Sequence, residues 1–252
     1  MWTVIEREGP ASELFDPTWF DAYDDRRTIV HLRPIGSAVV LGSSQNEFVV
    51  DGAAAAGSGV AVVRRRSGGG AVWLDGSLEW IDIVLPAGDP LVEADVHRAF
   101  YWLGDAFGES LVATTAADVA DAADASAPQV GVHHGSLARA PLNKLICFAG
   151  LGAGEVTLGG RKVIGISQRR TRRYTLFQCG VLRAWDPRPL VELLRPGLVA
   201  AGLVGPGIGV VSDIVSSIAD HCVGLGDDAA PVVADVVARL REATSLPVSF
   251  TS

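Results

Sequence analysis

The chain has 252 residues, of which 48% are hydrophobic, and it carries a formal net charge of −8 at pH 7 with a sequence pI near 5.1. This length and composition suit a globular protein with a substantial core and exclude a disordered chain. The acidic balance argues against general binding of nucleic acid or anionic membranes, which requires broad positive charge. We therefore expect no nucleic-acid partner and no membrane partner.

The cysteines and the N-terminus indicate the cellular compartment. Three cysteines are too few and too scattered for a disulfide framework or a zinc site: Cys147, Cys179 and Cys222. The opening stretch MWTVIEREGPASELFD is acidic and has no apolar signal core. His133 and His134 have no cysteine or carboxylate at ligand spacing, so we expect no metal site there. These features predict a cytoplasmic protein.

Strands dominate the first part of the chain. Residues 28–44 have the pattern of two short strands around a Pro-Ile-Gly turn. Residues 46–59 predict a weak helix that ends at a glycine. A strand at 60–66 runs into a glycine triplet, and a strand at 78–86 is stopped by a proline.

Helices dominate the last part of the chain. Residues 89–111 have helical apolar spacing, and the Ala/Asp-rich residues 113–128 predict a mobile loop or a marginal helix. A hairpin with a Gly-Gly turn is expected at 155–171, followed by a strand at 174–185. Further helices are expected at 187–195, 213–222 and 231–244. This order favours an α+β domain with helices packed on a sheet.

The glycine triplet follows a strand that ends in three arginines. In the stretch from Arg64 to Ala71, consecutive backbone N–H groups can converge on an anion, and adjacent guanidiniums can add bidentate phosphate contacts. Three glycines in a row cost backbone entropy on folding, so we expect something to approach this backbone closely. The stretch is neither a P-loop nor a dinucleotide fingerprint, and a plain hairpin with solvated arginines stays open.

A lysine directly after the Gly-Gly turn is the second candidate. Only Lys144 and Lys162 are lysines among the 21 basic residues, so arginine occupies nearly every other basic position. A compact ammonium at Lys162 can hold a carboxylate or phosphate in a tight site that a planar guanidinium does not fit. The alternative is a turn lysine that is exposed to water.

Together these segments resemble the lipoate-protein ligase family, which shares its catalytic domain with biotin ligases and octanoyltransferases. The resemblance rests on RRRSGGGAVW, on GGRKVIGISQRR about ninety residues later, and on TIVHLRPIGSAVVLGSSQN with Gly42 and Gln45. It spans roughly residues 27–186. It implies an α+β fold with a mixed, mainly antiparallel sheet and helices packed on it, as in the biotin/lipoate ligase (class II synthetase-like) catalytic domain.

The resemblance also implies roles for individual residues and a division of the chain. The glycine loop would wrap an acyl-adenylate, Arg65 would meet the nucleotide, and Lys162 would hold the acyl carboxylate and the phosphate as a catalytic residue. Substrate or nucleotide would also contact Ser67, Gly68, Gly69, Gly70, Ala71, Val72, Trp73, Gly165, Ile166 and Ser167. The expected units are an N-terminal extension (1–26), the catalytic domain (27–217) and a C-terminal helical extension (218–252).

This sequence departs from the family pattern at several positions. Leu74–Asp75–Gly76–Ser77 replaces a histidine and an asparagine after the loop, and Cys179–Gly180 replaces a His-Gly pair. The stretch ICFAGLGAGEV (146–156) stands where an Asn-Asp pair is usual. Its Cys147, fifteen residues before Lys162, resembles the nucleophile of one octanoyltransferase branch, although a buried apolar cysteine is equally compatible with the sequence. Cys179 and Cys222 are interpreted as structural.

Three functions remain open at this point. The first is a ligase that attaches lipoate or octanoate to a lysine of a lipoyl domain through an acyl-adenylate, with ATP and Mg as co-substrates. The second is an octanoyl or lipoyl transferase that works through a Cys147 thioester without a cofactor. The third is a non-catalytic protein that binds lipoate or its adenylate.

The expected acceptors are the lipoyl domains of 2-oxoacid dehydrogenases or the glycine cleavage H protein. Such domains are commonly acidic, and a dense basic cluster could steer one toward the site: Arg169, Arg170, Arg172 and Arg173. A solvated hairpin end is the alternative interpretation of this cluster.

Overall fold

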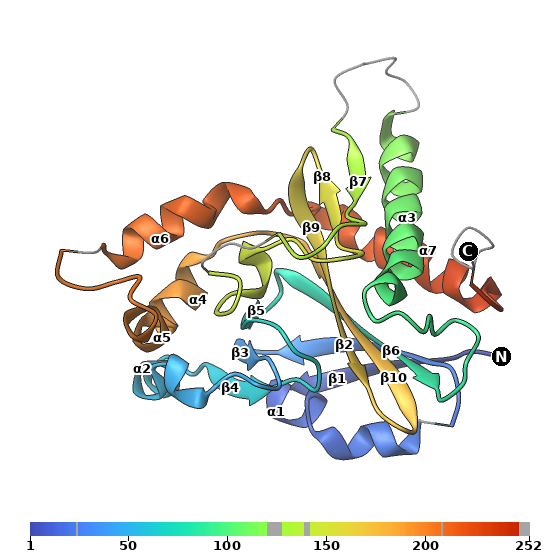
Figure 1. The fold of residues 1–252 in the computed structure, drawn as a ribbon, viewed down its shortest axis with the longest axis horizontal. Helices are drawn as coiled ribbons and strands as arrows, with labels where there is room; N and C mark the ends of the chain where they lie inside the picture. Colours follow the sequence, from blue (N-terminus) through green and yellow to red (C-terminus); the bar gives the residue numbers. More distant parts are fainter. Residues whose placement is uncertain (24, 120–127, 139–141, 208, 247–252) are drawn as a thin grey trace.

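The computed structural model describes residues 1–23, 25–119, 128–138, 142–207 and 209–246 (Figure 1). Within these residues the larger sheet has seven strands in the order β1-β2-β6-β10-β9-β8-β7. β1 and β2 run parallel, and the other neighbouring pairs of this sheet are antiparallel. The bounds are β1 Thr3–Pro10, β2 Thr28–Ile35, β6 Leu78–Pro86, β10 Tyr174–Leu182, β9 Arg161–Arg170, β8 Val156–Leu158 and β7 Val130–Val132.

Two helices, α3 (Tyr101–Val119) and α7 (Ala229–Glu242), pack against each other and against this sheet (Figure 1). Their buried side chains join Ile81, Ile83 and Leu85 of β6 in one core cluster. Trp80 and Val84 of the same strand are buried on the opposite face. Because both faces of β6 are covered, its sequence is almost continuously apolar rather than alternating.

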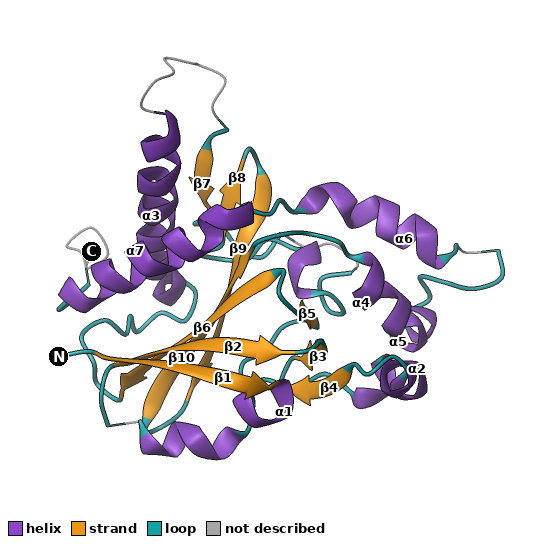
Figure 2. Cartoon of the chain, turned by 180° about the vertical axis from the view of Figure 1, so that it is seen from behind, coloured by secondary structure: helices purple, strands orange, loops and turns teal. Residues whose placement is uncertain are grey.

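A smaller sheet holds the segment that leads into the glycine triplet. It has the order β4 (Ala61–Arg64), β3 (Ala38–Leu41), β5 (Val72–Leu74), with β3 parallel to β4 and antiparallel to β5. Val39 and Leu41 face a cluster built with the helices, whereas Ala38 and Val40 face the larger sheet. The surrounding helices are α1 Ala11–Leu14, α2 Gly52–Gly57, α4 Arg188–Leu193, α5 Arg195–Ala200 and α6 Val211–Ile218 (Figure 2).

The predicted α+β class, with a mainly antiparallel sheet and packed helices, is confirmed. The Gly-Gly hairpin at 155–171 is also present. Gly159 and Gly160 have φ values of +58° and +77°, as a two-residue hairpin turn requires. The two strands predicted within 28–44 are present, but β2 and β3 belong to different sheets.

Some predicted bounds are wrong. The helix expected over 89–111 begins as an α-helix only at Tyr101, after a short 3-10 turn at Arg98–Phe100. The stretch before it folds as a loop, held by side-chain caps such as Asp95 on the His97 and Arg98 amides. The same helix extends to Val119, into the stretch predicted as a loop or marginal helix, and 120–127 lie outside the described residues.

The division at 26/27 and at 217/218 stays a prediction. In the structure, β1 pairs along its length with β2, and α7 contributes Val232, Val233 and Val236 to the main core cluster. Both ends of the described chain are therefore packed on the same sheet.

Candidate active site

The glycine loop, defined here as Ser67–Gly70, borders a cavity of about 300 Å³ between the two sheets. Residues of the segment from Cys147 to Ala153 also line the cavity, and we call this segment the wall. Residues of β9 line it as well, and we call them the floor. Six of the residues singled out from the sequence line this cavity: Gly68, Gly69, Gly70, Cys147, Ile166 and Ser167. Segments far apart in the sequence thus meet at one small-molecule-sized space.

The three glycines of the loop differ in why, or whether, the structure requires glycine at that position. A Cβ on Gly70 would lie 2.6–2.7 Å from backbone atoms of Ile146 and Cys147, so only glycine fits this contact. Gly69 has a φ of +101°, and a Cβ there would meet the Arg65 guanidinium at 2.7 Å. A Cβ on Gly68 would have no neighbouring atom within 4 Å, because this residue faces the open cavity. The protein itself therefore requires two of the glycines, and Gly68 leaves room for a ligand.

The segments that resembled the family's opening strands hold this loop in place. A Cβ on Gly42 would clash with the carbonyl of Gly69, so the two backbones touch. Gln45 donates from Nε2 to the carbonyls of Lys144 and Leu145, at 3.1 and 3.2 Å. Gly42 thus packs on the loop, and Gln45 bonds to the main chain just before Cys147.

The glycine loop contains backbone donors that have no acceptor within the described part of the chain. Among the residues that the structure describes, the amide nitrogens of Gly68, Gly69 and Gly70 have no hydrogen-bond acceptor. The flanking amides are used: Ser67 N–H donates to Gln178 Oε1 and Ala71 N–H to the Leu145 carbonyl. Successive unpaired amides in a concave turn favour an anion or a developing oxyanion.

Arg65 lies beneath the loop rather than in the cavity. Its side chain is buried, and its Nη2 donates to the Gly68 carbonyl at 2.6 Å while Nε donates to Ser67 Oγ at 3.2 Å. Burial lowers the pKa of Arg65, although the nearby Cys147 and Asp82 act in the opposite direction. In this conformation the guanidinium supports the loop, and the contact of Arg65 with a nucleotide stays a prediction.

A buried polar network continues from the loop into the larger sheet. Ser67 Oγ contacts Ser167 Oγ at 2.7 Å and Gln178 Oε1 at 2.8 Å. Gln178 Nε2 donates to Asp82 Oδ1, which also accepts from Trp80. Burial raises the pKa of Asp82 to about 7, with its two hydrogen bonds and Arg65 opposing the rise. The buried network beneath the loop therefore contains a carboxyl group, that of Asp82, whose pKa lies near neutral pH.

Lys162 is buried, with 3% of its side chain exposed, so the interpretation as a water-exposed turn lysine is wrong. Its Nζ lies 2.7 Å from Glu155 Oε2 and donates to the carbonyls of Cys147 and Gly150 at 3.1 and 3.0 Å. Burial alone would lower the pKa of Lys162, but Glu155 and the other acidic neighbours raise it above its ordinary value. All three ammonium donors are therefore used within the protein.

Lys162 also lines a different cavity from the glycine loop. A second space of about 310 Å³ is bordered by Lys162, Phe148, Asp220 and His221, among others. The two cavities share Gly150 as a lining residue. The segment around Gly150 thus separates a space on the loop side from a space on the lysine side.

Cys147 is half-buried and lines the cavity on the loop side. Its Sγ lies 4.0 Å from Arg65 Nη2, and Gly69 is the facing loop residue. Both main-chain groups are held, because the Cys147 N–H donates to the Ala71 carbonyl at 3.0 Å and its carbonyl accepts from Lys162. The main chain of Cys147 is therefore fixed, and its thiol lies beside the Arg65 guanidinium and the glycine loop.

The other sequence candidates lie outside this cavity. Ala71, Val72 and Trp73 border only a very small space against Phe148 and Trp185. Gly165 faces the Phe148 ring, where a Cβ would lie 3.2 Å from the ring edge. In this structure these residues support the walls rather than the open space.

Cys179 and Cys222 are both buried. Burial raises the pKa of both thiols, to about 12 for Cys222 and well above the ordinary value for Cys179. Cys222 donates to the Phe148 carbonyl at 3.2 Å. These surroundings suit structural thiols.

The cavity is also lined by residues that were not named as site candidates from the sequence, among them His97, Phe100, Asn143, Glu155 and Gln168. Asn143 Nδ2 and Gln168 Nε2 are buried and have no hydrogen-bond partner among the described residues. Two idle amide donors add to the free loop N–H groups, so the cavity suits a ligand with oxygen acceptors. Only Gln168 had a signal, as the residue that ends the GISQ stretch.

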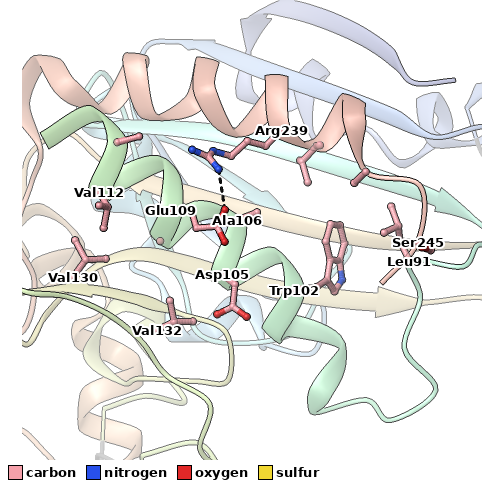
Figure 3. A pocket seen from close by; sticks show the side chains of 14 residues that line it. Leu91, Trp102, Asp105, Ala106, Glu109, Val112, Val130, Val132, Arg239 and Ser245 are labelled. Atoms are coloured by element: carbon pink, nitrogen blue, oxygen red, sulfur yellow. Dashed lines mark hydrogen bonds and ion pairs between the residues drawn. The ribbon is translucent and has the colours of Figure 1, made fainter. Parts of the chain in front are cut away.

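A larger groove of about 780 Å³ lies elsewhere, between α3, β7 and α7 (Figure 3). Its lining is mostly apolar and includes the Glu109–Arg239 ion pair of 2.8 Å. None of the described site candidates lines it.

Two other expectations concern metals and membranes. The described residues contain no group of three His, Cys, Asp or Glu side chains placed to hold a metal ion. Across the same described ranges, no helix has the length and apolar character needed to cross a membrane.

The fold is that of lipoate-protein ligase catalytic domains. A bipartite lipoate protein ligase from Thermoplasma acidophilum superposes with a TM-score of 0.68 at 16% identity, covering 95% of this chain and 82% of that one. A putative lipoate protein ligase from the same organism with bound lipoic acid gives 0.61 at 17% identity, covering 96% and 85%. A lipoate-protein ligase A bound with ATP gives 0.60 at 17% identity, covering 95% and 84%.

The sequence itself establishes the family. Residues 15–242 match the family described as the lipoyl protein ligase A/B catalytic domain, and the chain belongs to this family. No curated protein matches the chain.

Proposed function

We propose that this protein transfers an octanoyl or lipoyl group to a lysine of an acceptor domain through a thioester on Cys147. The observation that carries the proposal is the position of Cys147 Sγ, in the cavity, 4.0 Å from the buried Arg65 guanidinium and opposite the glycine loop. Cysteine is a nucleophile that can carry an acyl group as a thioester, and a sulfur that lines the cavity is within reach of a ligand bound there.

The chemistry has two balanced steps. In the first, the Cys147 thiolate attacks the carbonyl carbon of an acyl thioester donor, a new C–S bond forms, and the donor leaves as a thiolate that takes a proton. In the second, the neutral amine of the acceptor lysine attacks the Cys147 thioester. The amide bond forms, the nitrogen loses a proton, and the Cys147 thiolate leaves.

The residues of the cavity suit both steps. Each passes through a tetrahedral carbon that bears an oxyanion, and the free N–H groups of Gly68, Gly69 and Gly70 would stabilise it. Phe100, Leu137 and Ile166 provide apolar wall for a medium-length acyl chain. A volume of about 300 Å³ is small for an acyl group together with a nucleotide.

An ATP-dependent ligase is the second candidate. The observation in its favour is the second cavity of about 310 Å³, which Lys162 lines and which meets the first at Gly150. In a ligase, ATP with Mg would activate lipoate or octanoate, and a lipoate-protein ligase A of similar fold has been solved bound with ATP. Acyl and nucleotide would then occupy the two cavities on either side of Gly150.

One set of assays separates the candidates. Cys147→Ser and the control Cys222→Ser are incubated with octanoyl-carrier protein and examined by intact mass, and turnover is measured with a lipoyl-domain acceptor. We expect a wild-type mass increase of one octanoyl group, lost in Cys147→Ser with a fall in turnover of about 10²-fold or more. Cys222→Ser should keep both, because a serine hydroxyl can donate the same bond to Phe148.

The alternative outcomes are equally specific. Pyrophosphate release from ATP with lipoate, retained in Cys147→Ser, would establish the ligase and reject the thioester. Tight binding of lipoate with neither reaction would identify a non-catalytic binding protein.

A further inference from the structure

Glu155 is buried at the centre of the candidate site, although no sequence pattern marks it as a functional residue. Its side chain is 6% exposed and lies 2.7 Å from the ammonium of Lys162. Glu155 Oε2 also accepts from the Gly152 N–H at 2.6 Å, and Oε1 accepts from the Ile166 N–H at 3.3 Å. Both carboxylate oxygens are thus used.

The contacts of this ion pair all end on the wall and the floor of the cavity. Lys162 on β9 holds the carbonyls of Cys147 and Gly150, and Glu155 holds the amide of Gly152. Glu155 also bonds to Ile166 on the floor. One carboxylate and one ammonium therefore fix the main chain of the Cys147–Gly152 segment against β9.

A buried ion pair is rarely the cheapest way to stabilise a fold. Apolar residues of similar volume are often as stable, whereas removal of one partner leaves an uncompensated buried charge. A pair that makes four further hydrogen bonds to the main chain around one cavity is better explained by geometry than by stability.

We propose that Glu155 is a positioning residue, which acts through Lys162 to fix the main chain of Cys147 so that its thiol faces the glycine loop. This inference rests on the proposed function of Cys147. Cys147 has two main-chain groups, of which the N–H is held by Ala71 and the carbonyl by Lys162. Loss of the pair would free one of these two anchors and let the thiol leave its place.

The test uses the full-length variants Glu155→Gln, Lys162→Met and the double variant Glu155→Leu/Lys162→Met. Two quantities are measured: the rate at which iodoacetamide alkylates Cys147, followed by peptide mass, and kcat and KM for acyl transfer. The double variant keeps the test open if a lone buried charge prevents folding, because an apolar pair is tolerated at such positions.

We expect Glu155→Gln to change the alkylation rate of Cys147 by about 10-fold or more and to lower kcat, with KM for the acyl donor within about 3-fold of wild type. The double variant should lose no more kcat than Lys162→Met alone, because residues that act as a unit are not additive. Two results would overturn the inference. One is a kcat of the double variant that falls well below that of Lys162→Met, and the other is a wild-type alkylation rate in Glu155→Gln.

Asp89→Asn is the matched control. Asp89 pairs with Arg27 at 2.7 Å and its side chain is 5% exposed, but the pair does not line the cavity. This variant should lose stability without a change in Cys147 alkylation. Alkylation reports the position of the thiol even in a ligase, so a failure of the thioester proposal and a failure of this inference give different results.

Discussion

The glycine loop and the hairpin at residues 155–171, called here the lysine hairpin, are both marked by the family motifs. In the structure they differ in whether their polar groups already have hydrogen-bond partners. The amides of Gly68, Gly69 and Gly70 have no acceptors among the described residues, and these three glycines line a cavity. The three donors of Lys162 are all occupied by Glu155, Cys147 and Gly150. The loop therefore keeps unpaired donors, whereas the donors of Lys162 hold the wall of the cavity.

The two segments also differ in what covers them. The loop connects β4 to β5 and is open on its cavity side. Lys162 is covered by a segment about sixty residues later in the chain, where the Val223 N–H donates to the Lys162 carbonyl and Cys222 bridges to the same residue. A family motif therefore does not tell which of its polar atoms are already paired within the protein.

The largest expected effect separates the glycines within the loop. Gly70→Val should destabilise the protein by about 4 kcal/mol or more, because its side chain would overlap the backbone of Ile146 and Cys147. Gly68→Ala has free space and should change stability by less than about 1 kcal/mol. Urea unfolding of both variants measures the difference.

Ligand binding gives the complementary measurement. Gly68→Val should fold but bind an acyl ligand at least about 10-fold more weakly, since its side chain would enter the cavity. Equal stability of the Gly68 and Gly70 variants would show that the loop is not packed on the Cys147 segment.

The second effect compares the two regions by pH. Asp82, below the loop, has a pKa raised to about 7 in the folded protein from an ordinary 3.8. Because the folded pKa is higher, its stabilising contribution is full below about pH 3.8 and is lost as pH rises through 7. The Lys162 pKa is also raised, so the contribution of that lysine is full below 10.5 and is lost only above it.

Asp82→Asn should therefore flatten the dependence of unfolding free energy on pH between 4 and 8. The gain at pH 8 should be on the order of 2 kcal/mol, because relaxation around a buried charge absorbs part of the cost. Urea unfolding at several pH values measures it, and a slope equal to that of the wild type would remove Asp82 as the titrating group. Lys162 should not contribute over this range, because its pKa is raised above 10.5.

The fold could be predicted from the sequence because its signals are local. Proline-stopped β6, the Gly159–Gly160 turn and the apolar helices each depend on nearby residues. The family motifs also led to Cys147, Ser167 and the glycine loop, which meet at one cavity.

The rest of the site could not be predicted, because it depends on contacts between distant segments. Glu155 and Asn143 line the cavity together with the glycine loop, which lies about seventy residues or more earlier in the chain. The burial of Lys162 could not be predicted either, because it depends on contacts with Glu155, Gly150 and the segment at Cys222.

The smallest expected effect concerns the outer end of the lysine hairpin. Residues 169–173 contain four arginines in a chain of net charge −8, and Arg169 and Arg172 are exposed there. Arg170 is instead anchored, with its guanidinium donating to the carbonyl of Glu93. Ser167 and Gln168, which directly precede Arg169 on β9, line the cavity. The arginines therefore lie close to the cavity. An acidic acceptor domain would be attracted to this end of the hairpin.

Arg169→Ser/Arg172→Ser should lower kcat/KM for a lipoyl-domain acceptor by about 2- to 5-fold at low ionic strength, with kcat unchanged, because rim charges act on encounter. The loss should vanish near 1 M salt, where the Debye length falls to about 3 Å and charges on the surface are screened from each other. Arg241→Ser, an exposed arginine on α7, is the matched single-charge control and should have no effect. A short lysine peptide without acidic residues should show no difference between the variants. A loss that persists at high salt or with the peptide would place these arginines in the reaction itself, and the hairpin would then resemble the loop more than the structure indicates.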